Sequence, residues 1–451
     1  MVTSCNTGRN LNSMAYFGGQ IVNPKSTKVY FIKNGKNIDS AKLNKDNKFL
    51  LKLKNLKPGL YSFKHGNEYQ YVFFNTNDSI IIRLNTWDFD ESLVFSGRGA
   101  ERNNFLLNLL LNNENEDKLF LSYYSLAPKP FEAKIDSALK VKNNLYKQYK
   151  ANTKEKLEFF NELVKSAIKY PLYRKKEYYP FFHNQKLKLN KYPNLDSKFY
   201  DFRQNINPND SSLVYFYPYR NYVASYIFRK AYKEKFDNPN SNLALNKLKY
   251  TVKTLKDKQL RNVFLYRFIS NSFVNHELTE KQRKLALQIF NENCNNPEML
   301  KEIKQLAFDF DNIKKGTKLF NFKIINVKGH KLNASSVLKN NKTVLYFWSN
   351  SVINANNLSK RILYLKKQYP KLNFIGINLD TSKKTWLKSN IFKFLDAKNQ
   401  YQLTQKCVMR NFITAKTPRI ILLNNNAIVK NGFTVFWASN FTKELENLEK
   451  N

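Results

Sequence analysis

The spacing of apolar residues changes twice along the chain, and this limits the folds that its 451 residues can adopt. Residues 16–96 hold short runs rich in aromatic and β-branched side chains, separated by turn signals. Residues 100–310 place apolar side chains three and four positions apart, which is the helical period. Residues 314–451 alternate between strand-like and helix-like segments. These patterns predict a multidomain α+β protein.

The changes of pattern divide the chain into four predicted parts. They are a tether over residues 1–15, a β-rich sandwich over 16–99, a helical domain over 100–313 and an α/β domain over 314–451. Strands are predicted at 29–32, 49–53, 60–63, 69–74 and 79–84, and helices at 131–150, 155–170, 219–235 and 281–293.

Two aromatic features of these parts carry their own predictions. His65 lies beside the turn glycine Gly66, which is typical of a solvated loop residue. Tyr219, Tyr222 and Tyr226 are three and four positions apart and share one helical face. Such a stripe can line a groove, but it is more typical of a core whose hydroxyl groups reach the surface, and we expect the core.

The last part has the clearest order of elements. A hairpin is centred on Gly329, and a final amphipathic helix ends the chain. Strands are predicted at 343–348, 372–379, 419–423 and 427–429, and helices at 352–368, 385–391 and 402–410. Strands that alternate with helices of this length indicate an α/β layer domain.

Composition excludes several classes of protein. Hydrophobic residues make up 42% of the chain, enough apolar surface to offset the entropy of folding, so disorder is excluded. No run of about 18 apolar residues is present, so no helical membrane span is predicted. Three cysteines and four histidines form neither a disulfide framework nor a cluster with zinc-ligand spacing. We therefore predict no metal and no cofactor.

The charge balance is strongly basic. The chain has 76 Lys and Arg against 35 Asp and Glu, a formal net charge of +41, and residues 314–451 are about twice as basic per residue as the rest. The lysines are scattered, and abundant Lys and Asn with only 12 glycines favour a composition bias. An anionic surface or partner is the alternative, and specific nucleic-acid binding is not expected.

The first residues resemble a bacterial lipoprotein cleavage site. Val2 stands three positions before Cys5, Ser4 precedes the cysteine directly, and a polar stretch that can serve as a tether follows. The apolar segment of a secretory signal is not present before Cys5. We expect the native product to be exported with a signal segment that this chain lacks, and to be lipidated at Cys5. The alternative is an ordinary cysteine on a frayed terminus.

Residues 314–451 resemble the thioredoxin-like domain of bacterial envelope proteins of the TlpA and ResA type. The strand ending Tyr346–Ser349 is similar to the family's strand before its redox motif. The run Ile377–Asp380 with Trp386 is similar to the segment after the first βα unit. Thr417 and Pro418 precede an apolar strand where the family has a cis-proline, beside a groove that pairs with an extended peptide.

The rest of the chain also matches this family. The β region and its end at Phe95–Leu106 resemble the β-rich domain that precedes such thioredoxin-like domains in Bacteroidetes envelope proteins, with a helical insert between the two. The resemblance implies an N-terminal β-sandwich, a central helical domain and a C-terminal α/β thioredoxin-like fold. It also implies a periplasmic or outer-membrane location, with membrane contact only through a lipid anchor.

The resemblance breaks down at the chemistry. The family has Cys-x-x-Cys at the N-terminus of its first helix, where the helix dipole favours thiolate. The corresponding positions here are Val352 and Ala355, so dithiol exchange is not expected. Ser349 and Ser351 near this helix start are predicted as helix caps, the alternative being hydroxyl groups that replace the thiol. Cys407 is expected to be a lone buried cysteine.

Three hypotheses for the function remain open. The leading hypothesis is a non-enzymatic binding or assembly module that contacts an envelope protein or an extended peptide. The second is an activity related to thiol-disulfide oxidoreductases that uses the thiols of a partner, a fold-level analogy. The third is an anion-binding module, based on the charge of residues 314–451.

Overall fold

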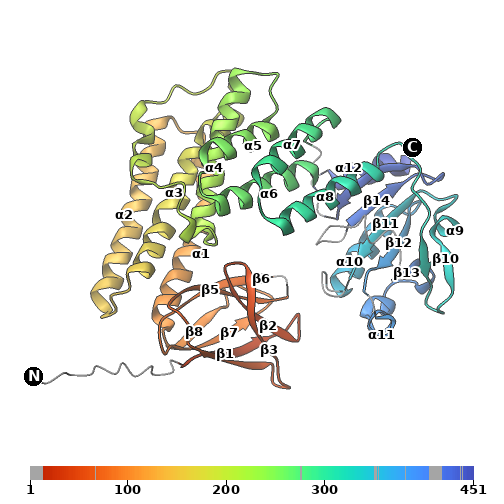
Figure 1. Ribbon diagram of the computed structural model, residues 1–451, viewed down its shortest axis with the longest axis horizontal. Helices are drawn as coiled ribbons and strands as arrows, with labels where there is room; N and C mark the ends of the chain where they lie inside the picture. Colours follow the sequence, from red (N-terminus) through yellow and green to blue (C-terminus); the bar gives the residue numbers. More distant parts are fainter. Residues whose placement is uncertain are drawn as a thin grey trace, which may run out of the picture. The chain divides into compact units, whose positions relative to one another are not determined.

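The computed structural model is a mixed α/β protein (Figure 1). It divides into two compact units. The N-terminal unit ends at Leu260 and the C-terminal unit begins at Arg261. The structure describes residues 14–66, 68–274, 277–349, 353, 355–380, 382–405, 419–436, 438 and 440–450.

The N-terminal unit begins with two four-stranded sheets that share one apolar core. The first sheet has the order β4-β1-β7-β8 and consists of β1 (Met14–Val22), β4 (Lys48–Lys54), β7 (Ser79–Asn85) and β8 (Val94–Arg98). The second has the order β3-β2-β5-β6 and consists of β2 (Lys28–Lys33), β3 (Lys36–Lys42), β5 (Gly59–His65) and β6 (Glu68–Phe74). All five predicted strands are present.

The two-residue period explains this packing. Phe49, Leu51 and Leu53 alternate with exposed residues along β4, so one face of the strand enters the core. β2 and β3 are joined through Asn34 and Gly35, both with positive φ, as an Asn-Gly hairpin turn requires.

The prediction that His65 is a solvated loop residue is wrong. His65 is the last residue of β5 and is 1% exposed. Its Nε2 accepts from the backbone N–H groups of Lys25 at 3.0 Å and Ser26 at 3.3 Å, and its Nδ1 lies 3.0 Å from the carbonyl oxygen of Lys28. The period of β5 turns this side chain inward, where it satisfies the backbone before β2.

Helices make up the rest of the N-terminal unit. They are α1 (Ala100–Tyr123), α2 (Pro128–Asn152), α3 (Glu158–Leu187), α4 (Tyr217–Asp237) and α5 (Leu243–Thr254), with 3₁₀ turns η1 (Ser197–Asn205) and η2 (Ser211–Leu213). Tyr219 and Tyr222 of α4 are buried against Tyr170 of α3, which confirms the core interpretation for these two tyrosines. The Tyr219 hydroxyl donates to the Asn207 carbonyl and accepts from the Asp210 N–H.

The C-terminal unit begins inside a helix. Helix α6 (Lys258–Val274) crosses the division, and α7 (Glu280–Asn293) and α8 (Pro297–Asn312) follow. Helix α8 belongs with the C-terminal sheet, since its Asp309 pairs with Arg419 and its Phe310 ring lies 6.1 Å from that of Phe433. The predicted division at residues 15, 99 and 313 stays a prediction.

A seven-stranded sheet forms the centre of the C-terminal unit. Its order is β10-β9-β13-β12-β11-β14-β15. The strands are β9 (Lys323–Ile325), β10 (Lys331–Asn333), β11 (Thr343–Trp348), β12 (Asn373–Asn378), β13 (Gln400–Leu403), β14 (Arg419–Leu423) and β15 (Val429–Val435). β12 pairs in parallel with β11 and with β13, whereas β14 pairs antiparallel with β11 and with β15. The hairpin β9–β10 around Gly329 is confirmed.

Helices cover both faces of this sheet, and β11 is therefore buried along its whole length. Val344 and Trp348 share a core with residues of α10 (Ala355–Gln368) and α12 (Phe441–Lys450), whereas Leu345 and Phe347 share the opposite core with residues of α9 (Ala334–Leu338). A strand buried on both faces loses the polar alternation of an edge strand. The short helix α11 (Lys383–Leu387) buries Trp386 in the same core as α10.

The predicted helix at 402–410 is wrong where the structure describes it. Gln402 and Leu403 belong to β13, where Gln402 pairs with Asn378 of β12 on one side and Ile325 of β9 on the other. Pairing with two strands distant in sequence overrides the local helical pattern.

Candidate functional site

The candidate site lies where β11 ends and α10 begins. β11 is buried along its whole length and ends at Trp348, and the following Ser349 is 6% exposed. The N–H of Leu379 donates to the Trp348 carbonyl at 2.8 Å, and the N–H of Ile353 donates to the Ser349 carbonyl at 3.1 Å. These two bonds satisfy the carbonyl groups of Trp348 and Ser349 at the end of β11.

Ala355, the second predicted motif position, is the first residue of α10. The helix is held by an apolar face that contains Leu358, Ile362 and Leu365. The first turn of a helix has free backbone N–H groups and the positive end of the dipole, which is the environment that activates a thiol. At Ala355 a methyl group occupies that environment.

Several predicted site residues fall outside the described residues. They are Cys5, Ser351, Val352, Thr417 and Pro418. Ser349 is described, and it is buried directly after the end of β11. Its role as a helix cap stays a prediction.

A buried ion pair holds the start of β14 directly after Pro418. The Arg419 guanidinium pairs with the Asp309 carboxylate of α8, and both side chains are at most 1% exposed. Arg419 Nε also donates to the Gly432 carbonyl at 3.0 Å. Burial lowers the pKa of Arg419, and Asp309 opposes this shift. Sequence reasoning missed the pair, because its members are 110 positions apart and neither belongs to a motif.

A hydrogen bond between two buried side chains near the candidate site requires a glycine in β12. Gln400 Nε2 donates to the Tyr346 hydroxyl at 2.8 Å, and both side chains are buried. A Cβ atom on Gly376 would lie 2.2 Å from Gln400 Oε1 and 2.7 Å from Tyr346 Oη. The hydrogen bond between β11 and β13 therefore passes over a position that must lack a side chain.

The cysteine among the described residues belongs to a different element from the candidate site. Cys294 is the described free cysteine, 5% exposed at the C-terminal end of α7. Burial raises the pKa of its thiol, which disfavours the nucleophilic thiolate. Cys407 lies outside the described residues.

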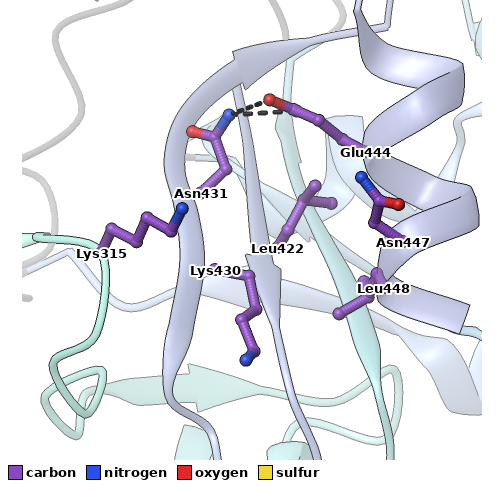
Figure 2. A pocket seen from close by; sticks show the side chains of 7 residues that line it. All are labelled: Lys315, Leu422, Lys430, Asn431, Glu444, Asn447 and Leu448. Carbon is purple, nitrogen blue, oxygen red and sulfur yellow. Dashed lines mark hydrogen bonds between the residues drawn. The ribbon is translucent and has the colours of Figure 1, made fainter. Parts of the chain in front are cut away.

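A cavity of about 430 Å³ lies at the other end of the sheet. Leu422 in its wall pairs with Val344, which is about 13 Å along β11 from Trp348 at the usual rise per strand residue. Asn431 points toward Glu444 and donates to its carboxylate at 2.9 Å (Figure 2).

The charge of this cavity is mixed. The exposed lysines Lys315 and Lys430 line it together with the Glu444 carboxylate (Figure 2). A carboxylate in the wall weakens the binding of an anion. The cavity therefore does not favour the anion-binding hypothesis for the C-terminal unit.

The part of the chain that the structure describes contains neither a metal-binding cluster nor a helix that could span a membrane. No group of three or more His, Cys, Asp or Glu side chains there can hold a metal ion. None of the helices there combines the length and apolarity that a membrane crossing needs.

Solved structures with thioredoxin-like folds are similar to parts of the chain. A thioredoxin-like protein from Bacteroides caccae is 14% identical, with 57% of this chain and 97% of that chain covered and a TM-score of 0.35. A Bacteroides vulgatus protein, described provisionally as a thiol-disulfide oxidoreductase, is 16% identical over 31% of this chain and 99% of its own, with a TM-score of 0.27.

A thiol peroxidase from Chromobacterium violaceum is also 16% identical, over 31% of this chain and 88% of its own, with a TM-score of 0.25. No protein-family model matches the chain, and no curated protein matches it. Because identities and TM-scores are this low, the activities of these proteins are not transferred to this chain.

Proposed function

We propose that the chain is a thioredoxin-family protein of the bacterial envelope whose C-terminal unit binds a partner without dithiol chemistry. The observation that supports the proposal is that α10 begins at Ala355, the residue to which the resemblance assigns the family's second motif cysteine. A methyl group can neither form nor resolve a mixed disulfide. The connection from β11 through α10 to the parallel β12, and the terminal hairpin β14–β15, agree with the segments on which the resemblance rests.

The proposed partner is an envelope protein or an extended peptide. The segment of Thr417 and Pro418 precedes β14, and the buried pair of Arg419 and Asp309 fixes the first residue of that strand. In the family, backbone beside the cis-proline pairs with an extended substrate segment. This pairing needs no sulfur, because main-chain hydrogen bonds supply the affinity. Anchoring through a lipidated Cys5 would keep the protein at a membrane surface.

The decisive experiment measures the reduction of a protein disulfide by dithiothreitol. We expect no catalysis by the purified protein, because neither Val352 nor Ala355 has a thiol. A Val352→Cys, Ala355→Cys variant should contain a titratable dithiol that oxidises reversibly, since the two positions are three apart at a helix start. Catalysis that survives replacement of Cys5, Cys294 and Cys407 by serine would refute the proposal.

The location is tested separately. Intact mass of the protein purified from native membranes should reveal an acyl group on Cys5. An unmodified cytosolic species that begins at Met1 would contradict the envelope assignment and leave the dithiol result unaffected.

A further inference from the structure

A second cavity, of about 390 Å³, lies within the N-terminal unit and is independent of the proposed site. Its floor is formed by β2, β5 and β6, and its other wall by η2, the start of α4 and one residue of α3. Strand pairing places Ser62 beside Tyr71 and Lys64 beside Tyr69 on the same face of the sheet. The volume is in the range of pockets that hold small molecules.

Tyr71 fixes the two walls relative to each other. Its hydroxyl donates to the Tyr215 carbonyl and accepts from the Tyr217 N–H, both at 2.9 Å. Its ring contacts that of Phe216 with the centroids 5.4 Å apart. A Cβ on Gly35 would lie 2.9 Å from Tyr215 Cε1, so the turn after β2 packs directly against the same wall. The cavity is therefore preformed by contacts that need no ligand.

Three cations line the cavity: Lys33, Lys64 and Arg220. Lys33 Nζ donates to the Leu60 carbonyl at 2.9 Å and lies 3.9 Å from the centre of the Tyr61 ring, which leaves further N–H groups. Arg220 and Lys64 are half-buried, and neither has a carboxylate partner among the residues that the structure describes. No described residue in the lining is Asp or Glu.

This arrangement contrasts with the other half-buried arginines of the unit. Arg203 and Arg229 both pair with Glu177, and Arg174 pairs with Asp117. A partly desolvated guanidinium without a carboxylate is electrostatically costly, unless an external anion completes its fork of donors. Arg220 has such an incomplete environment, and it borders an open cavity.

Aromatic rings supply the second half of the recognition surface. Tyr69 is 45% exposed and Phe159 is 37% exposed, although both line the cavity. Phe159, Tyr215 and Phe216 belong to the helical wall, whereas Tyr69 belongs to the sheet. Exposed aromatic rings beside cations bind flat or ring-shaped ligands by stacking, while the cations bind an acidic group.

We propose that this cavity binds a small organic anion of one or two rings that carries a phosphate, sulfate or carboxylate group. The acidic group pairs with Arg220 and Lys64, and the ring packs against Tyr69, Phe159 and Tyr215. Both parts are required, because isolated surface charges bind inorganic ions only weakly.

Ligand-detected NMR and calorimetry on the full chain test the proposal. Phenyl phosphate, benzoate and glucuronate are the probes, with inorganic phosphate as the charge without a ring and benzyl alcohol as the ring without a charge. We expect at least one of the three probes to saturate below about 10 mM and to bind at least about 10-fold more tightly than either reference compound.

Variants locate the binding site. Arg220→Gln should weaken the best probe by about 10-fold or more, because a charge-assisted hydrogen bond is lost. Lys64→Gln and Tyr69→Ala provide independent variants on the other wall and should each weaken it by about 3-fold or more. Lys52→Gln, on an exposed position of β4 outside the cavity, is the matched control and should change binding by less than about 2-fold.

Three outcomes would overturn the proposal. One is the absence of saturable binding by all three probes. Another is equal affinity for phenyl phosphate and inorganic phosphate, which would indicate charge alone. The third is unchanged binding in folded Lys64→Gln and Tyr69→Ala, with thermal unfolding used to verify folding. Which probe binds best identifies the acidic group.

Discussion

Each unit joins a helix to a sheet through a buried arginine–aspartate pair, yet the two pairs are built differently. In the N-terminal unit Arg102 of α1 pairs with Asp78, directly before β7, and their side chains are 1% and 3% exposed. Arg102 Nη1 also donates at 2.6 Å to Glu155, which is 42% exposed. In the C-terminal unit Arg419 has Asp309 as its carboxylate partner, and these side chains are 1% and 0% exposed.

The second carboxylate reverses the electrostatic balance. Burial lowers the pKa of Arg102, but hydrogen bonds and attraction from Asp78 and Glu155 outweigh it, and the net pKa is raised. For Arg419 burial dominates over Asp309, and the net pKa is lowered. The charged form of Arg102 is thus favoured by its two carboxylates, whereas burial outweighs Asp309 at Arg419.

The largest expected effect comes from removing the Asp309 carboxylate of the C-terminal pair. Asp309→Ala removes the Asp309 counter-charge from the buried Arg419 guanidinium, and should lower the free energy of unfolding of the C-terminal unit by about 3–5 kcal/mol. Urea denaturation followed by tryptophan fluorescence measures this, since Trp348 and Trp386 are buried in that unit. A loss below about 1 kcal/mol would contradict the role of the pair.

Replacing both members of this pair should cost less than removing one. Arg419→Met with Asp309→Leu removes both buried charges and keeps apolar volume, so most of the stability lost in Asp309→Ala should return. The same denaturation experiment gives the comparison. If the double variant is as unstable as Asp309→Ala, then packing around the two side chains, and not charge, is what the pair supplies.

A smaller effect is expected from the second carboxylate of the N-terminal pair. Glu155→Ala removes a side chain that is 42% exposed, so solvent screening limits the loss to about 1 kcal/mol or less. Asp78 still neutralises Arg102 in this variant. Thermal unfolding of the N-terminal unit, monitored by far-UV circular dichroism, tests it. A loss equal to that of Asp309→Ala would remove the proposed difference between the two units.

The smallest effect over the physiological range is a dependence on pH in the N-terminal unit. Burial lowers the pKa of His65, so the unfolded state binds its proton more readily than the folded state. The stability from neutral His65 is fully present above the unfolded pKa of about 6.5 and is lost as the pH falls toward the lowered pKa.

Unfolding measured between pH 7 and pH 5 should reveal this loss. His65→Gln, which keeps an acceptor for the N–H groups of Lys25 and Ser26, should remove the dependence. A pH dependence that persists unchanged in His65→Gln would assign it to other groups.

Local patterns predicted much of the secondary structure. The strand at 343–348 and the strand at 419–423 have the predicted bounds, because continuous apolar runs between turn signals leave little choice of conformation. β13 was missed, because its residues become a strand only through pairing with β12 and β9. The sequence predicts a solvated His65, because the turn glycine next to it gives no information about the backbone groups that the imidazole contacts.

The two candidate sites also differ in how far the sequence alone predicts them. The positions Val352 and Ala355 come from spacing within one segment, which a sequence carries directly. The cavity of the N-terminal unit joins Lys64 and Tyr69 to Arg220, about 150 positions away, and no motif connects them.

The sequence by itself determined the apolar strands at 343–348 and 419–423, the absence of sulfur at Val352 and Ala355, and the basic charge, because these depend on residues that are neighbours in the chain. Only the tertiary structure decided which arginines pair with carboxylates among the described residues, and where His65 lies. These properties depend on contacts between distant segments, and such contacts form only when the chain exchanges conformational freedom for burial of its apolar faces.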